Sequence, residues 1–436
     1  MKKLFKKFIS DHNPFLLFFH KLKAVFAAVL YGFPADKMKV IGVTGTNGKT
    51  TTVNMITHLL YSSGYKVGML SSITFQINGE QWINKTKMST QSPFFIQKML
   101  RKMLKAGCEY AVIEVTSHSV VQSRVWGVNF DVGVWTNLSE DHLDYHGSWE
   151  NYAAAKFKFI AGVQGQKKKV GVPKVVVLNA DDAEFARFDS VHADKKYTFG
   201  LQKGDTRAAE VQLRPDGSTF LVSAPNAMIK IQMSLIGDFN VLNALAAVNV
   251  ALSQGLSQKD IEAGFKTMKP VPGRYEVIDC GQPFSVIVDY AHTEDALGKL
   301  CEIFRELTGG KLIVVFGSTG GGRDKGKRPK LGAIVAQYAD YIILTNDDPY
   351  EENQLQIIRD IRAGIPDIQI RNFEVIEIVD RGTAIEAGLG IASARDTVLI
   401  AGKGCEPVIA IDGKLIPWDD REVARNVLSR PQIVEL

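Results

Sequence analysis

One stretch, VIGVTGTNGKTTT at residues 40–52, restricts the fold more than any other part of the chain. An apolar, β-branched run enters a loop that contains Gly45 and Gly48, and Lys49 begins a segment with helical periodicity. A strand, a glycine-rich loop and a helix in this order are typical of a phosphate-binding loop, because backbone amides and the helix N-terminus then face an anion. We therefore expect an α/β domain that binds a nucleotide.

The loop is a variant of the strict GxxxxGK[ST] pattern, since Val43 stands where the first glycine should be. Lys49 is expected to reach the β- and γ-phosphates of the nucleotide, and the Thr50 hydroxyl is expected to bind Mg²⁺. The alternative is a glycine-rich turn without a phosphate. A phosphate-binding loop alone predicts nucleotide binding and leaves the reaction open.

Short β-branched runs alternate with helical patterns along the chain, which is typical of parallel α/β architecture. The expected strands fall into two series, 39–43, 110–115, 131–136 and 174–178, then 285–289, 311–316, 341–345 and 397–401. Between the series, residues 195–235 alternate apolar and polar side chains with period two, which predicts antiparallel ribbons on the first sheet. Two series of strands predict two sheets.

A linker is expected at residues 269–276, KPVPGRYE, which contain two prolines and a glycine. We therefore divide the chain into three parts. Residues 1–37 form a basic and apolar segment, and residues 38–271 form a central P-loop ATPase-type domain with a mostly parallel sheet. Residues 272–436 form a Rossmann-like α/β domain.

The charge of the chain is concentrated at its N-terminus. The formal net charge is +5, and residues 1–39 alone hold eight lysines and two aspartates. The rest of the chain is close to neutral, which argues against a nucleic-acid partner. The four cysteines are far apart without a CxxC pair, which argues against zinc and disulfides and favours the cytoplasm.

Residues 1–31 superficially resemble a signal peptide or a membrane anchor. The apolar run is interrupted by His20, Lys21 and Lys23, and neither half reaches the roughly 20 apolar residues that span a bilayer. A basic amphipathic segment is the better interpretation. It is expected either to lie on an anionic membrane or to pack on the protein or a partner, and both alternatives stay open.

Candidate catalytic groups follow the expected strands of the first series. Glu114 lies within or at the end of an apolar strand, where a buried carboxylate needs a cation or hydrogen-bond donors. Mg²⁺ is a natural partner, and a salt bridge at the strand end is the alternative. After the next strand, the segment NLSEDHLDYHG brings His142 to a strand's carboxyl end, where α/β sites form.

Lys156 lies on the apolar stripe of the helix that follows, together with Trp149, Tyr152 and Phe159, at positions i, i+3, i+7 and i+10. Lys158 lies off this stripe. A lysine on an apolar face can extend its ammonium to solvent along the surface. Near a carboxylate, a histidine and a phosphate loop, a role in the chemistry is the preferred interpretation.

The chain resembles the Mur ligase family, in its UDP-N-acetylmuramoyl-tripeptide synthetase branch. The similarity covers residues 31–425, and ten stretches occur in the family's order. They are VTGTNGKTTT, EVTSHSVVQSRV, TNLSEDHLDYHG with NYAAAK, VLNADD, GDFNVLNALAA, VPGRYE, DYAHT, FGSTGGGRDKGKRP, AGKGCE and WDDREVA.

The resemblance implies an ATP-dependent amide ligase of peptidoglycan synthesis, with Mg²⁺. ATP would phosphorylate the terminal carboxylate of a nucleotide-sugar peptide, and the amine of an amino acid would attack the acyl phosphate. Implied catalytic residues are Lys49, Lys156, His142 and Arg274, and implied metal ligands are Thr50, Glu114, His142 and a carbamylated Lys156. Implied ATP contacts are Gly45, Thr46, Asn47, Gly48, Lys49, Thr50, Thr51, Asn240, Asn243, Arg274 and Asp289.

The resemblance also implies the residues that hold the two joined substrates. The UDP-muramoyl peptide would contact Ser89, Thr90, Thr116, Gln122 and Arg124. The incoming amino acid would contact Arg323, Asp347, Asp348, Tyr350, Gly402 and Glu406. For Asn240 and Asp347, a helix cap and a turn cap are the alternatives.

Three departures from the family pattern bear on the substrates or on their site. Enzymes that add meso-diaminopimelate carry asparagine and arginine where this chain has Asp348 and Tyr350, so we expect L-lysine, ornithine or another diamino acid. Cys405 replaces the usual histidine of the GKGHE motif. Relatives begin with a whole domain that grips UDP, and residues 1–37 stand in its place, so UDP recognition is open.

We expect a monomer.

One alternative to a ligase of peptidoglycan synthesis is another ligase of the same superfamily, of the folylpolyglutamate or cyanophycin type. The other is a catalytically inactive nucleotide-binding partner of the wall-synthesis machinery. The retention of Glu114, His142, Lys156 and Asp289 argues against the inactive partner.

Overall fold

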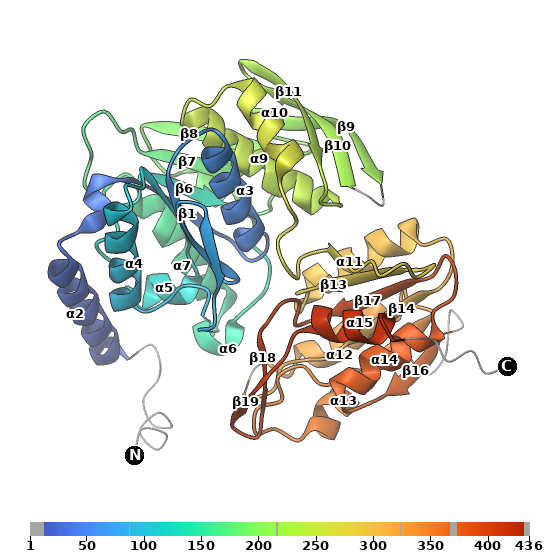
Figure 1. Cartoon of the computed structure of the whole chain (residues 1–436). Helices are drawn as coiled ribbons and strands as arrows, with labels where there is room; N and C mark the ends of the chain where they lie inside the picture. The colour runs from blue at the N-terminus through green and yellow to red at the C-terminus, as the bar shows by residue number, and fades with distance from the viewer. Residues whose placement is uncertain (1–12, 87, 215–216, 323, 367–372, 431–436) are drawn as a thin grey trace. The chain divides into compact units, whose positions relative to one another are not determined.

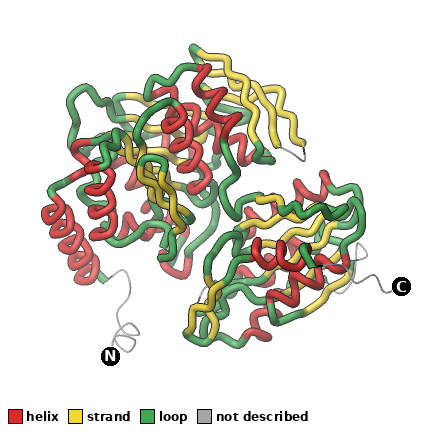
Figure 2. Tube along the Cα trace, viewed as in Figure 1, coloured by secondary structure: helices red, strands yellow, loops and turns green. Residues whose placement is uncertain are grey.

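The structure is a computed structural model that describes residues 13–86, 88–214, 217–322, 324–366 and 373–430 (Figure 1). The chain forms two compact units, Met1–Lys269 and Pro270–Leu436. Their boundary falls within the proline-rich segment 269–276. Each unit is built around its own sheet, as the strands in Figure 2 show.

The first unit contains one large sheet. Its strands are β1 (Lys39–Thr44), β2 (Val67–Leu70), β3 (Thr74–Ile77), β4 (Glu80–Ile83), β5 (Tyr110–Glu114), β6 (Val132–Trp135), β7 (Val175–Asn179), β8 (Lys195–Gly200), β9 (Thr206–Arg214), β10 (Gly217–Ala224) and β11 (Ala227–Met233). Their order across the sheet is β11-β10-β9-β8-β7-β6-β1-β5-β2-β3-β4.

The middle of this sheet is parallel, from β2 across to β9, and both margins are antiparallel. The prediction of antiparallel ribbons over residues 195–235 is wrong for its first part. β8 pairs with β7 in parallel, because helix α8 (Phe185–Asp189) lies between them and returns the chain in the same direction. β9 adds a short parallel pairing, and β10 and β11 are antiparallel as predicted.

Helices cover both faces of the parallel strands. The other helices of this unit are α2 (Pro14–Tyr31), the short η1 (Pro34–Lys37), α3 (Lys49–Ser62), α4 (Pro93–Lys105), α5 (Ser117–Val121), α6 (Leu143–His146), α7 (Trp149–Gly162), α9 (Asp238–Ser253) and α10 (Gln258–Thr267). Successive side chains of a strand face opposite sides. Val40 of β1 accordingly joins a buried core with residues of α4 and α7, and α3 packs on β1 and α9.

The second unit is a smaller parallel α/β layer structure. Its sheet has the order β12-β13-β17-β14-β15-β16, and only the short β12 is antiparallel to its neighbour. The strands are β12 (Glu276–Val277), β13 (Ser285–Asp289), β14 (Leu312–Phe316), β15 (Tyr341–Leu344), β16 (Glu374–Glu377) and β17 (Thr397–Ala401), with a separate hairpin of β18 (Val408–Ile411) and β19 (Lys414–Pro417).

Two buried cores lie on the two faces of this sheet. One contains residues of the first three helices of the unit, and the other contains residues of the last two. These helices are α11 (Glu294–Leu307), α12 (Lys327–Val335), α13 (Gln354–Arg362), α14 (Arg381–Ile391) and α15 (Asp420–Leu428). The expected fold class, a mostly parallel P-loop domain followed by a Rossmann-like α/β domain, is confirmed.

Topology places the candidate catalytic segments together. β1 lies between β5 and β6, and all three strands are parallel. The segments that leave their carboxyl ends, which begin at Gly45, Val115 and Thr136, therefore meet at one edge of the sheet, where ligand sites of α/β folds form.

Candidate active site

The phosphate loop joins β1 to the N-terminus of α3. Gly45 has φ of 154°, and a Cβ placed on it would lie 1.9 Å from Thr136 Oγ1, so only glycine fits there. The Thr136 hydroxyl donates to the Asn47 carbonyl at 2.7 Å, and the Asn47 amide donates to Asn137 Oδ1 at 2.9 Å. The segment after β6 thus fixes the shape of the loop.

The side chains of the loop have definite partners. Lys49 Nζ donates to the Thr46 carbonyl at 2.7 Å, which folds the lysine back over the loop. The Thr46 hydroxyl lies 2.9 Å from the Tyr152 hydroxyl and 3.0 Å from the Ser139 carbonyl. Thr51 is buried in the first turn of α3.

Glu114, at the end of β5, is buried and surrounded by donors. Its Oε2 accepts from the Thr50 hydroxyl and from the Ser72 amide, both at 2.9 Å, and its Oε1 accepts from the Ser72 hydroxyl at 2.8 Å. These contacts agree with the prediction that a carboxylate buried here needs a cation or hydrogen-bond donors, and donors are what the structure shows. Thr50 and Glu114, the first two expected metal ligands, are in direct contact.

Lys156 is fully buried on α7, and Lys158 on the same helix is exposed. Its Nζ donates to the Gly45 carbonyl at 2.5 Å and lies 4.6 Å from the centre of the Tyr152 ring. Burial and the positive charge of Lys49 lower the pKa of Lys156 well below its usual range. The amine therefore faces the phosphate loop and does not extend to solvent.

His142 is the N-cap residue of the short helix α6 and has a left-handed backbone, φ 54°. Its Nε2 lies 3.4 Å from Asp141 Oδ2, and its ring centre is 4.8 Å from that of His118. Tyr152 lies between His142 and the phosphate loop. Its ring centre is 6.3 Å from that of His142, and its hydroxyl contacts that of Thr46.

Two buried asparagines of α9 approach the same loop. A Cβ placed on Gly48, which has φ of 79°, would lie 2.1 Å from Asn243 Oδ1. That oxygen accepts from the Thr52 hydroxyl at 3.2 Å. Asn240 Nδ2 donates to the Ile236 carbonyl at 2.8 Å. Gly237 is the N-cap of α9 and Asn240 makes no capping hydrogen bond, so the helix-cap alternative for Asn240 is wrong. Asn243 therefore lies at the phosphate loop, with Asn240 one helical turn away.

Four of the five expected acceptor-binding residues form one hydrogen-bonded group beyond β5. The Thr90 hydroxyl lies 3.2 Å from that of Thr116, and Arg124 donates to the Thr90 carbonyl at 2.8 Å. Arg124 also donates twice to Gln122 Oε1, at 2.9 and 2.6 Å. Burial lowers the pKa of the Arg124 guanidinium. Ser89 is next to Thr90 and half-buried.

In the second unit, Arg274 lies just before β12 and Asp289 is the last residue of β13. The Asp289 carboxylate accepts from the amides of Tyr275 and Ala291 at 2.9 and 2.7 Å. Burial raises the pKa of Asp289 above its usual value. The Arg274 guanidinium lies over the Tyr290 ring at 4.6 Å, and its Nε has no hydrogen-bond partner among the described residues.

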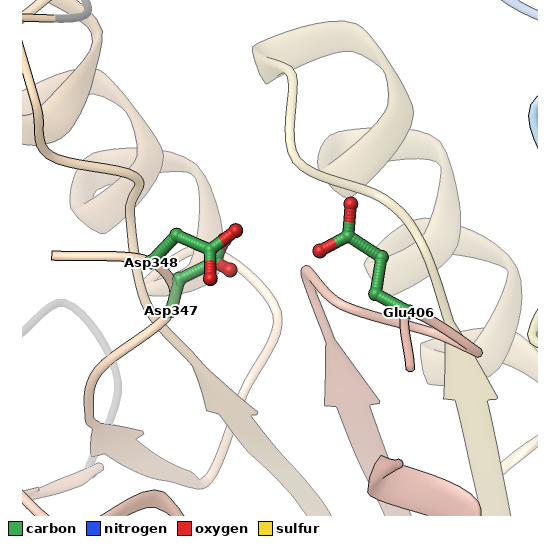
Figure 3. A group of neighbouring side chains, drawn as sticks. All are labelled: Asp347, Asp348 and Glu406. Carbon is green, nitrogen blue, oxygen red and sulfur yellow. The ribbon is translucent and has the colours of Figure 1, made fainter. Parts of the chain in front are cut away.

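Three acids from two loops converge in the second unit, as Figure 3 shows. Asp347 and Asp348 follow β15, and Glu406 lies between β17 and β18, with carboxylate oxygens within 4.8 Å of one another. Lys403 Nζ lies among them, at 3.6 Å from Asp347, 3.0 Å from Asp348 and 2.7 Å from Glu406. The Lys403 ammonium therefore lies where the three carboxylates could otherwise bind a metal ion.

Lys403 is charged in this setting. Burial lowers the pKa of its ammonium, but Asp347, Glu406 and Asp348 outweigh burial and raise that pKa above its usual value. The three carboxylates and one ammonium leave a net negative charge. The Glu406 carboxylate also accepts from the Tyr290 hydroxyl at 3.1 Å, and the charge of this carboxylate, together with burial, raises the pKa of Tyr290.

Of the other residues expected to contact the amino acid, Gly402 borders the three acids, Tyr350 contacts a neighbouring strand, and Arg323 is not described. Gly402 has φ of 112° and would place a Cβ 3.2 Å from Asp347 Oδ2, so it borders the acids. Tyr350 has a left-handed backbone, φ 53°, and its amide donates to the Ala410 carbonyl at 2.9 Å. Arg323 lies outside the described residues. Cys405, buried beside Gly273, has its pKa raised by burial to about 11.

Sequence reasoning missed two residues of these groups. Ser72 donates twice to Glu114, and nothing in its neighbourhood of small polar residues marks it as a partner. Lys403 had a detectable signal, since a lysine between two glycines directly after the apolar strand TVLIA stands at the end of a buried strand, where an ammonium needs carboxylate partners.

The comparisons with known proteins agree on one family. The family model "Mur ligase middle domain" matches residues 43–251, and "Mur ligase, glutamate ligase domain" matches residues 273–404. A protein of Geobacillus kaustophilus, "UDP-N-acetylmuramoyl-L-alanyl-D-glutamate--2,6-diaminopimelate ligase", is 38% identical over 403 residues, which cover 92% of this chain and 81% of the relative.

Two further matches point the same way. The "UDP-N-acetylmuramyl-tripeptide synthetase" of Roseiflexus sp. is 39% identical and covers 93% of this chain and 81% of its own length. A solved structure of a UDP-N-acetylmuramoyl-L-alanyl-D-glutamate--2,6-diaminopimelate ligase is similar with a TM-score of 0.61 and 32% identity, over 90% of this chain and 78% of the other. The phosphate loop, the two α/β units and these matches define an ATP-dependent ligase. The chain belongs to the Mur ligase family.

Proposed function

We propose that the chain adds an amino acid to the terminal carboxylate of a UDP-N-acetylmuramoyl dipeptide, with consumption of ATP, in cytoplasmic peptidoglycan synthesis. The strongest support from the structure is the convergence of Lys49, Glu114 and Lys156 on one phosphate loop. The strongest support from the comparisons is the name that several relatives of 38–39% identity share.

The proposed ATP site is the loop of residues 45–51 with the N-terminus of α3. Backbone amides there can receive phosphate oxygens, and Lys49 can turn from the Thr46 carbonyl to a phosphate. Asn240 and Asn243 stay predictions for the adenine side. Arg274 and Asp289 stay predictions for ATP binding in the second unit.

Of the residues proposed to hold Mg²⁺, Thr50 and Glu114 offer the oxygen ligands that this ion prefers. Glu114 is already oriented by Ser72 and touches the Thr50 hydroxyl. A lysine ammonium is a poor ligand, but carbamylation would give Lys156 a carboxylate-like end. His142 completes the proposed set. When bound, the ion would offset negative charge on the phosphates of ATP.

The proposed reaction has two steps. An oxygen of the acceptor carboxylate attacks the γ-phosphorus of ATP, the bond to the bridging oxygen breaks, and ADP leaves. The amine of the amino acid then attacks the acyl carbon, an amide forms, and phosphate leaves with the acceptor's oxygen. Lys49 would stabilise the charge on the transferred group, and Arg124 with Thr90 and Thr116 would position the acceptor.

The three acids around Lys403 favour an amino acid whose side chain ends in an ammonium, and L-lysine, ornithine or another diamino acid is proposed. Asp347, Asp348 and Glu406 exceed the single positive charge of Lys403, so a second cation is favourable there. Tyr350 has no guanidinium to pair with a distal carboxylate. Several relatives are named for 2,6-diaminopimelate, so the pocket is where this chain is proposed to differ.

Phosphate release from the purified full chain tests the proposal. The mixture contains ATP, Mg²⁺ and UDP-N-acetylmuramoyl-L-alanyl-D-glutamate, with L-lysine, L-ornithine or meso-diaminopimelate in parallel. Release that needs both acceptor and one diamino acid is expected. No stimulation by any pair would reject the function, and stimulation by folate with glutamate would favour the other branch of the superfamily.

A further inference from the structure

Helix α2 carries an apolar stripe that the body of the protein leaves uncovered. The stripe consists of Phe15, Phe18, Phe19, Leu22, Phe26, Val29 and Leu30, and each of these side chains is classed with the exposed large hydrophobics. Phe15 is 83% exposed and Phe26 is 61% exposed. The spacing of three and four residues places all seven on one side of the helix.

The opposite side of α2 is packed on the protein. Ala24, Ala27 and Ala28 are fully buried, and α2 lies against α4 (Figure 1). A Cβ placed on Gly127 would lie 2.9 Å from the Ala28 Cβ, so small residues allow the close approach. The alanine face thus anchors α2 to the unit and fixes the apolar stripe outward.

Positive charge borders the stripe. Lys21 and Lys23 are exposed and stand on its two sides, and Lys23 Nζ lies 4.4 Å from the centre of the Phe19 ring. Helix α2 contains no aspartate or glutamate. Upstream, the sequence adds Lys2, Lys3 and further lysines. A phenylalanine-rich stripe between cations matches the apolar and anionic layers of a lipid surface.

A second copy of the chain is a poorer occupant. Stripe-to-stripe packing would bring the lysines of one α2 beside those of the other, with no carboxylate on either helix to pair with them.

A bilayer-spanning orientation of α2 also agrees poorly with the structure. By length and composition α2 could cross a membrane, with 18 residues and a mean hydropathy of 1.5. The buried alanine face and the two mid-helix lysines favour an orientation in the membrane plane.

We propose that α2 docks the protein on an anionic lipid surface, with the apolar stripe in the interface and Lys21 and Lys23 at the headgroups. Docking of this kind needs no change in the ligase site.

Cosedimentation of the full chain with vesicles tests the proposal. Vesicles of phosphatidylcholine alone are compared with vesicles that also contain phosphatidylglycerol. The double variant Phe18→Ser, Phe26→Ser should lower the partition coefficient by about tenfold or more, since two rings leave the interface. The matched control Val170→Ser, Met228→Ser removes exposed apolar side chains elsewhere and should bind like the native chain.

The charge variant Lys21→Glu, Lys23→Glu should abolish the preference for phosphatidylglycerol, and added salt should weaken the native binding. Unchanged circular dichroism and ATP turnover show that each variant is folded. Failure of the native chain to bind phosphatidylglycerol vesicles, or equal binding by the Phe18, Phe26 variant, would overturn the proposal. A dimer in sedimentation velocity that this variant dissociates, without vesicle binding, would assign the stripe to a second copy and also overturn it.

Discussion

At Lys156, burial and the charge of Lys49 work against an ammonium, because both disfavour a second positive charge at the phosphate loop. The side chain nevertheless ends within hydrogen-bond distance of the Gly45 carbonyl. A carbamate at this position would replace an unfavourable cation with an anion beside Lys49 and a divalent ion.

Replacement of Lys156 by alanine should reduce kcat by about 100-fold or more, since the phosphate loop would lose the charged group proposed to hold Mg²⁺. Lys158→Ala on the same helix is the matched control and should retain activity, because that side chain is exposed. Mass spectrometry of the active native protein should show one added CO₂ on Lys156. Full activity of protein with an unmodified Lys156 would contradict the carbamate.

The substrate preference should follow Asp348 and Tyr350. The variant Asp348→Asn, Tyr350→Arg removes a negative charge and supplies a guanidinium, so the ratio of kcat/KM for meso-diaminopimelate to that for L-lysine should rise by about tenfold or more. Tyr350→Phe is the control and should leave the ratio unchanged. An unaltered ratio in the double variant would show that other residues choose the amino acid.

At the scale of elements, a buried ion cluster joins the amino ends of three strands. Asp131, just before β6, accepts from the Val40 amide of β1 at 2.9 Å and pairs with Lys174 before β7 at 3.0 Å. Lys169 is a further partner of the same carboxylate. Asp131→Asn should lower the unfolding free energy of the first unit by about 3–5 kcal/mol, because the buried Lys174 and the half-buried Lys169 lose their counterion.

The exposed pair Asp189 and Lys196 offers a control for this cluster. Asp189→Asn should change the unfolding free energy by only about 0–1 kcal/mol, since solvent screens the pair. Denaturant unfolding of both variants measures the difference. A cost for Asp131→Asn as small as that of the control would show that the buried cluster contributes little to stability.

In the second unit, Arg328 connects two loops of the proposed amino-acid pocket. It pairs with Glu352 and Asp360 and donates to the Thr319 carbonyl at 3.4 Å. The Arg328 hydrogen bonds lower the pKa of Glu352 from 4.5 to about 2. The pair therefore stabilises the fold fully above pH 4.5, and this contribution is lost as the pH falls towards 2.

Thermal unfolding measured over this pH range checks the effect. The melting temperature of the native chain should fall as the pH decreases from 4.5 to 2, and part of that fall should be absent in Glu352→Gln. Identical pH profiles for the two proteins would mean that the Arg328 pair does not contribute to acid stability.

On the scale of the whole molecule, the sequence predicted the parallel strands well, because buried parallel strands are continuous apolar runs. β13 and β17 begin and end where expected, and β1, β5, β6 and β7 differ from expectation by one residue at most at either end. The direction of β8 was mispredicted, because a period of two does not distinguish a parallel partner from an antiparallel one. Local pattern determines a strand, and the connections determine its neighbours.

The candidate site divides in the same way. The sequence singled out Lys49 and Thr50 from the glycine-rich loop, and Glu114 and Lys156 as polar residues in an apolar strand and on an apolar helix stripe, and the structure brings the four to one loop. Their roles in the reaction stay predictions. The pairing of Ser72 with Glu114 and of Lys403 with three acids depends on loops that converge only in the fold. The outward direction of the α2 stripe also depends on which face α4 covers.

In the proposed reaction, ATP phosphorylates the acceptor carboxylate before the amine attacks. The transfer of oxygen can be followed with UDP-N-acetylmuramoyl-L-alanyl-D-glutamate labelled with ¹⁸O in its terminal carboxylate, in the presence of ATP, Mg²⁺ and L-lysine. An amide product and one ¹⁸O atom in each phosphate released are expected. Amide formation with unlabelled phosphate, or no acceptor-dependent phosphate with any diamino acid, would contradict the proposed reaction.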